Sequence, residues 1–247
     1  MKFLYLKNMT IIKRMHLINA IAFIIILGIV VILIFINTDK KDTNLKPVQL
    51  TLSLISDNSF LNSIKLEPQK EKEIILIEAS KILRDEIHSV TDNKHKDFVL
   101  DDFKNVYPII DFILAIDSNN GHAIYFKGEI YRLLNDNDRF LKYFQLYLDI
   151  EDSIRSRLPK VTNARLCYET AHGYCEERTA WISQLLANYY YKKGISESDL
   201  SKKLESLNIA MKHIQNVRIH FPNGFKSSSV TMSTLELETK LKADISK

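Results

Sequence analysis

Hydrophobic and polar positions follow three different patterns along this chain of 247 residues. Residues 17–36 form a continuous apolar run (LINAIAFIIILGIVVILIFI) without a charged side chain. Apolar and polar residues then alternate over 48–54, and beyond residue 69 apolar residues recur at spacings of three and four. The last spacing is the period of amphipathic helices. The pattern predicts an all-α protein with a transmembrane anchor (17–37), a linker or stalk (38–69) and a helical domain (70–247).

The apolar run is long enough to span a membrane. At about 1.5 Å of rise per residue, a helix of this length crosses the roughly 30 Å hydrocarbon core of a bilayer. The alternatives are a buried core helix and a cleaved signal peptide. The apolar region of a signal peptide is usually about 7–15 residues and ends in small residues, whereas this run ends at Phe35, Ile36 and Asn37. We therefore expect an uncleaved anchor.

The charges beside this run predict its orientation. Residues 1–16 contain four basic side chains and no acidic one, whereas the charges of residues 39–42 cancel. Cytoplasmic flanks carry the excess of Lys and Arg. We expect a single-pass protein of the inner (plasma) membrane, with residues 1–16 in the cytoplasm and the bulk of the chain in the periplasm or its extracytoplasmic equivalent.

The remaining charge and the motifs exclude several function classes. The chain has 34 basic and 30 acidic side chains, so removing the four basic residues of the flank leaves a balanced domain. A nucleic-acid partner is not expected, because it would require a basic excess. No G-x-S-x-G, H-E-x-x-H or Gly-rich phosphate loop occurs. The sequence predicts no catalytic residue, no metal site and no cofactor.

Helices are predicted from the apolar period and its polar breaks. Residues 48–54 fit a short strand or an extended segment docked on the domain. Pro108 should kink the second helix or mark its true start. Ser198 is expected to cap the helix that follows it, and Ser227–Ser229 the last one. The expected helices cover residues 69–90, 100–116, 122–134, 138–150, 175–193, 199–220 and 230–245.

Two of these helices form the most informative stretch, residues 121–152. A polar turn separates them, and Gly128 lies inside the first, where it costs about 1 kcal/mol against Ala and indicates a closely approaching partner helix. The stretch resembles a tetratricopeptide repeat (TPR), a helix–turn–helix unit of about 34 residues. Gly128 matches the small residue of that motif, Tyr131 its tyrosine and Phe144 its helix-B aromatic. Residues that depart from the motif are Ile124, Lys127, Phe140 and Asp152.

The resemblance implies an array of antiparallel helical hairpins, either a TPR-like α-solenoid or an irregular bundle. In such repeats the inner helix lines a concave face that binds peptides. The positions of this chain that match that face are His122, Tyr125, Glu129 and Arg132. The alternative is a helix face that only contacts solvent.

The two cysteines lie in the cluster Cys167-x4-His172-x2-Cys175. Along one straight helix they would be too far apart for a disulfide, but a chain reversal at Gly173 would bring them together. We expect a disulfide, because the domain is predicted to be exported. Free thiols and a zinc site remain as alternatives, although this spacing matches no common structural zinc site.

Two function classes follow from these observations. The first is a membrane-tethered interaction or scaffold protein of the cell envelope that binds a protein or peptide partner. The second is an exported envelope-associated enzyme with an unfamiliar helical site near His172–Arg178. We interpret Glu176–Arg178 as a surface ion pair, and His213 and His220 as solvent-exposed residues. The sequence does not predict the partner or the oligomeric state.

Overall fold

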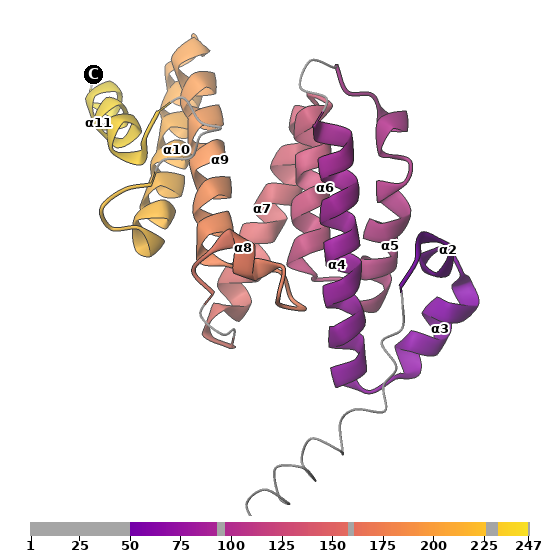
Figure 1. Cartoon of the computed structure of the whole chain (residues 1–247). Coiled ribbons are helices and arrows are strands. Elements are labelled where there is room, and N and C mark those ends of the chain that lie inside the picture. Colours follow the sequence, from indigo (N-terminus) through magenta and orange to yellow (C-terminus); the bar gives the residue numbers. More distant parts are fainter. Residues whose placement is uncertain (1–49, 93–96, 158–160, 226–231, 247) are drawn as a thin grey trace, which may run out of the picture. The chain divides into compact units, whose positions relative to one another are not determined.

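The computed structural model describes residues 50–92, 97–157, 161–225 and 232–246 (Figure 1). Every regular element in these ranges is a helix, so the predicted all-α class is confirmed. None of the described helices is long and apolar enough to cross a membrane, and the anchor predicted at residues 17–37 lies outside the described residues. The elements are α2 (Leu52–Ile55), α3 (Asn58–Leu66), α4 (Gln69–Thr91), η1 (Leu100–Phe103), α5 (Val106–Ile116), α6 (Gly121–Leu133), α7 (Asn137–Ile154), η2 (Arg155–Arg157), α8 (Ala164–Cys167), α9 (Glu176–Ser196), α10 (Leu200–His220) and α11 (Thr234–Ile245).

The compact unit begins at Leu50, about twenty positions before the predicted start of the helical domain. The expected strand or extended segment at residues 48–54 is wrong over its described part, because α2 and α3 form there. Thr51 caps α2 and Asp57 caps α3 by accepting backbone N–H groups. Phe60 of α3 stacks on Phe112 of α5, with the ring centroids 6.2 Å apart. The caps Thr51 and Asp57 stabilise the helices, and this outweighs the strand tendency of a short alternation of apolar and polar residues.

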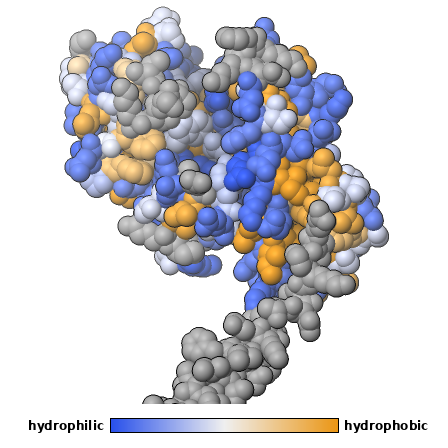
Figure 2. Space-filling model, viewed as in Figure 1, coloured by the Kyte–Doolittle hydropathy of each residue, from blue (hydrophilic) through white to orange (hydrophobic). Residues whose placement is uncertain are grey.

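Pro108 explains why the helix predicted over 100–116 is divided. The structure has a short 3₁₀ helix, η1, followed by α5, and Pro108 is the third residue of α5. The N–H groups of the first helical turn have no partner within the helix, so proline costs little there. Of the two predicted roles for Pro108, the true start is correct. The exposed side of α4 is largely hydrophilic, and hydrophobic side chains reach the surface beside it, toward α2 and α3 (Figure 2).

Helices α6 and α7 form the predicted hairpin. Asn120 caps α6 by accepting from the N–H groups of His122 and Ala123, and Asp136 caps α7. A Cβ atom added to Gly128 would overlap the ring of Phe144 on α7. The close helix approach predicted from this glycine is therefore confirmed.

Helices α9, α10 and α11 complete the described chain. Asp199, not the predicted Ser198, caps α10, because its carboxylate accepts from the N–H groups of Ser201 and Lys202. The last helix begins at Thr234, where Ser233 and Glu236 form a capping box, and not at residue 230. The predicted caps Ser227–Ser229 lie outside the described residues.

Three hydrophobic cores follow one another along the chain. The first lies among α2–α6, the second among α6, α7 and α9, and the third among α9–α11. Helix α6 contributes to the first two cores and α9 to the last two. Because each group of helices shares a member with the next, the described helices have the character of a helical-repeat protein.

Candidate functional site

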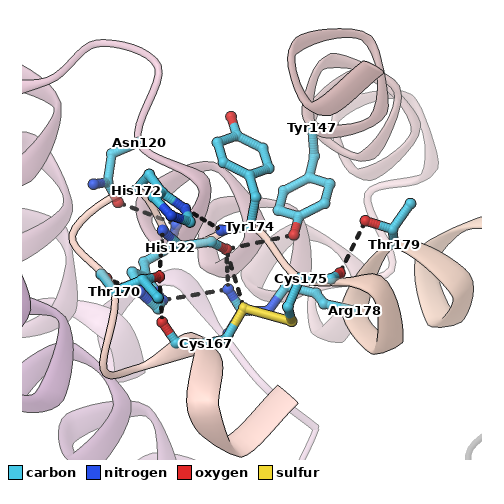
Figure 3. Close-up of a disulfide and its surroundings, with 11 residues drawn as sticks. Asn120, His122, Tyr147, Cys167, Thr170, His172, Tyr174, Cys175, Arg178 and Thr179 are labelled. Carbon is cyan, nitrogen blue, oxygen red and sulfur yellow. Dashed lines mark hydrogen bonds between the residues drawn. A yellow bond between two sulfur atoms is a disulfide. The ribbon is translucent and has the colours of Figure 1, made fainter. Parts of the chain in front are cut away.

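The segment between α8 and α9 forms a loop closed by a disulfide (Figure 3). Cys167 is the last residue of α8 and Cys175 is the N-cap of α9. Their Cα atoms are 5.7 Å apart and their sulfur atoms are bonded. Gly173 has φ of +75°, in the left-handed region that glycine adopts most readily. The predicted disulfide and the chain reversal at Gly173 are confirmed.

This disulfide loop, residues 168–174, is attached to the start of α6 and to α9 by hydrogen bonds. Four consecutive carbonyl groups, of residues 170 to 173, accept hydrogen bonds from the start of α6 and from α9, and the Gly173 carbonyl also accepts from the Tyr147 hydroxyl at 3.4 Å. The loop's backbone is therefore satisfied by fixed donors. In order, the donors are His122 Nε2 (3.1 Å), Asn120 Nδ2 (2.6 Å), the Gly121 N–H (2.7 Å) and Arg178 Nη1 (2.7 Å).

Two glycines permit this close approach of loop and helix. A Cβ on Gly121 would lie 2.8 Å from the carbonyl oxygen of Gly173. A Cβ on Gly173 would overlap the backbone nitrogen of His122. The contact between backbones therefore requires that neither residue has a side chain.

Arg178 is the charged centre of this junction. It is only 3% exposed, which contradicts the surface ion pair expected for Glu176–Arg178. Its guanidinium carbon lies 4.3 Å from the ring centroid of Tyr125 and 5.1 Å from that of Tyr168. Its polar partners in the described part of the chain are the Gly173 carbonyl and His122, and no carboxylate lies within ion-pair distance. A carbonyl dipole and two aromatic faces stabilise the buried cation.

His122 is held neutral by these contacts. Its Nε2 donates to the Thr170 carbonyl, so Nδ1 carries no proton and accepts from Arg178 Nη1 at 3.3 Å. Burial and, secondarily, the charge of Arg178 hold the pKa of His122 well below its usual range. The imidazole therefore stays uncharged in the folded protein at neutral pH.

The predicted binding stripe lies on α6 but does not form an open face. His122 is fully buried, so its predicted surface position is wrong. Tyr125 packs under Arg178, while Glu129 and Arg132 form a bidentate ion pair with distances of 2.9 and 3.0 Å. The cause is the disulfide loop, which covers the start of the helix face. A binding role for the more accessible end of the stripe stays a prediction.

The two histidines of α10 are also buried, contrary to expectation. His213 is 6% exposed, and burial together with Lys212 lowers its pKa to about 4. The His220 side chain is 4% exposed, and its Nδ1 lies 3.9 Å from a Glu176 oxygen. Burial lowers the pKa of His220, although the neighbouring Glu151 and Glu176 act in the opposite direction.

An open cleft of about 550 Å³ lies beside the disulfide loop. Three segments line it: the first half of α4, the end of α5 with Asp117, and loop residues 169–172. Leu76, Ile77 and Ile116 provide its apolar part. Its volume is within the range of ligand sites, and its lining is more polar than is usual for a small-molecule pocket. Sequence reasoning missed this cleft, because its walls come from segments far apart in the chain.

His172 belongs to the wall of the cleft, and the sequence identified it only as a candidate in another role. Its Nδ1 accepts a hydrogen bond from the Tyr174 N–H at 3.2 Å, so Nε2 carries the proton. That Nε2 is buried without a hydrogen-bond partner in the described structure. Burial lowers the pKa of His172, while Asp117 and Glu73 act to raise it. The neutral ring therefore supplies an unused hydrogen-bond donor.

Comparison of the chain with protein-family models, with curated proteins and with solved structures gives no match. The geometry of the cleft and of the disulfide loop is therefore the basis for inferring a function.

Proposed function

We propose that this chain is a membrane-tethered helical-repeat adaptor of the cell envelope that binds a segment of a partner protein in the cleft. One observation carries the proposal: the open cleft of about 550 Å³ has an apolar part, charged rims and a wall fixed by a disulfide. Such a site suits an extended peptide, because apolar area supplies affinity and a few polar groups fix orientation.

The fixed wall supports a binding role. The carbonyl groups of loop residues 170–172 accept hydrogen bonds from the start of α6, and the disulfide closes the loop that contains them. A preorganised wall avoids the entropic cost of ordering a loop when a ligand binds. The loop is therefore built to present a constant surface.

Tethering and export are part of the proposal and rest on the sequence. The apolar run within residues 17–37 and the basic flank before it support an anchor with the described domain outside the cytoplasm. A disulfide persists in oxidising compartments, which supports the same placement. We keep the resemblance of residues 121–152 to a TPR as an expectation about how the hairpins are arranged.

No specific observation favours the alternative of an enzyme with a site near His172–Arg178. Arg178 is buried beneath the disulfide loop and is engaged by the Gly173 carbonyl. His172 uses Nδ1 to accept from Tyr174. Neither side chain is arranged with a nucleophile in the described structure, and the cleft is interpreted as a binding site.

Site-specific photocrosslinking tests the adaptor function. Gln69, an exposed residue of the cleft rim, is replaced by p-benzoyl-phenylalanine in the full chain in its native membrane. Irradiation should give a discrete adduct with one partner protein, identified by mass spectrometry. The matched control carries the same residue at Lys202, which is exposed on α10 away from the cleft. Absence of an adduct at position 69, or the same adduct at both positions, would contradict the proposal.

A further inference from the structure

The cleft carries an excess of negative charge that the described fold does not neutralise. Glu73, Asp117 and Glu169 line it together with a single cation, Lys72. Within the ranges described, none of the three carboxylates is in an ion pair; Glu73 accepts a hydrogen bond from Gln69 and Asp117 accepts from its own turn. Glu73 and Glu169 are exposed and Asp117 is half-buried, so the three carboxylates attract a cationic ligand through the field that they share across the concave surface.

The unused donor of His172 is an independent indication of a ligand. The ring cannot turn to pair Nε2 without losing the hydrogen bond that Nδ1 accepts from Tyr174. A buried donor without an acceptor is unfavourable, because it has lost its hydrogen bond with water. A ligand that supplies a carbonyl oxygen at this wall would remove that cost.

The apolar part of the cleft lies with these polar groups. The half-buried Ile77 lies on α4 with Glu73, and the half-buried Ile116 is the last residue of α5, directly before its C-cap Asp117. Long basic side chains cover apolar surface with their methylene stems while the charged head contacts carboxylates. The cleft thus has a surface for the stem and carboxylates for the head group of one arginine or lysine.

We propose that the bound segment is basic: an extended peptide that places an arginine or lysine side chain between Glu73, Asp117 and Glu169. Its stem packs on Ile77 and Ile116, and a main-chain carbonyl accepts from His172 Nε2. This inference rests on the proposed adaptor function and adds the chemical class of the partner. A peptide fits better than a free polyamine, because only the peptide offers the carbonyl acceptor.

Fluorescence anisotropy with the full chain in dodecyl maltoside tests this chemistry. The probe is a fluorescein-labelled peptide, Ala-Ala-Leu-Arg-Leu-Ala-Ala with an amidated C-terminus, and the comparison peptide has glutamine in place of arginine. At 50 mM salt the arginine peptide should bind at least tenfold more tightly. The difference should shrink at 0.5 M salt, because salt screens partly exposed charges.

Charge variants place the binding in the cleft. Glu73→Gln combined with Glu169→Gln should reduce the affinity for the arginine peptide at least tenfold. The affinity for the glutamine peptide should stay nearly unchanged. The matched control, Asp138→Asn with Glu205→Gln, removes the same charge from exposed positions on α7 and α10 and should bind like the wild type. A double variant that binds the arginine peptide normally would overturn the assignment.

Other outcomes separate this inference from the adaptor function. Equal binding of the arginine and glutamine peptides, together with a specific adduct at position 69, would overturn the basic ligand and leave the adaptor function standing. If spermidine displaces the arginine peptide at equal concentration, the ligand is a free amine, and the proposal of a peptide ligand is overturned. Loss of the adduct at position 69 would contradict the adaptor function itself.

Discussion

Arg178 and His122 lie 56 residues apart in the chain, yet Nη1 of the arginine is 3.3 Å from Nδ1 of the histidine. The buried guanidinium thus contacts a neutral imidazole, where a carboxylate would be the usual partner. The arrangement is consistent because Nε2 of His122 donates to the Thr170 carbonyl and leaves Nδ1 free to accept. One pair of side chains therefore connects the first turn of α6, the first turn of α9 and the disulfide loop.

Replacing Arg178 should destabilise the fold. Arg178→Gln removes the cation from the faces of Tyr125 and Tyr168 and weakens the contact with the Gly173 carbonyl, so the free energy of unfolding should fall by about 2–4 kcal/mol. Urea unfolding followed by circular dichroism measures the change. Arg139→Gln, at a largely exposed arginine that pairs with Asp136, should change stability by less than about 1 kcal/mol. Equal effects of the two variants would contradict the role of Arg178.

The disulfide should be present in the purified protein and should contribute to stability. Intact mass under denaturing, non-reducing conditions should show no thiol label, and two labels should appear after reduction. Cys167→Ser combined with Cys175→Ser should lower the free energy of unfolding by about 2–3 kcal/mol, as expected for a short closed loop. Two labelled thiols without reductant would show that the pair is not bonded.

Gly128→Ala tests the close packing of α6 and α7. Alanine is the better helix former by about 1 kcal/mol. The added Cβ overlaps the Phe144 ring, however, so we expect a net loss of about 1–3 kcal/mol in the free energy of unfolding. When Phe144 is also replaced by Leu, the ring that the added Cβ overlaps is absent. The loss of stability caused by Gly128→Ala should then be smaller, since neighbouring substitutions are coupled. A stabilised Gly128→Ala protein would show that the helices separate easily.

Stability should fall as the pH is lowered, because His213 is buried in its neutral form. Its pKa is about 4 in the folded protein and about 6.5 when unfolded, so the unfolded chain binds the proton more readily between these values. Neutral His213 makes its full contribution to the free energy of unfolding above about pH 6.5. As the pH falls toward 4, up to about 3 kcal/mol of that free energy is lost. Unfolding in urea at several pH values measures the slope.

The His213→Gln variant should lack this part of the pH dependence. His213 stacks on Tyr190 with ring centroids 6.0 Å apart, so the variant loses some stability at every pH. The difference in free energy of unfolding between the variant and the wild type should nevertheless become smaller as the pH falls from 7 to 4.5, because only the wild type loses the contribution of neutral His213. The control is His88→Gln, at an exposed position of α4, which leaves His213 and its contribution to the pH dependence in place. A constant gap for His213→Gln would contradict the assignment.

Features that depend on neighbouring residues in the chain were predictable from the sequence. The three-and-four spacing of apolar residues gave the helices α4, α6, α7, α9 and α10 within a few residues, since this period belongs to the helix itself. Pro108, Gly128 and Gly173 were interpreted correctly, because the backbone restrictions of proline and the missing side chain of glycine act locally. The disulfide followed from one reversal between two nearby cysteines.

Only the tertiary structure decided which polar residues are buried and where a ligand fits. Arg178, His122 and His213 occur in polar or mixed sequence and look exposed, but their burial depends on partners tens of residues away. The cleft likewise combines α4, the end of α5 and the disulfide loop. A hydrophobic period reports which side of one helix faces a core. It carries no information on which distant loop covers that side, since that depends on the sum of many long-range contacts.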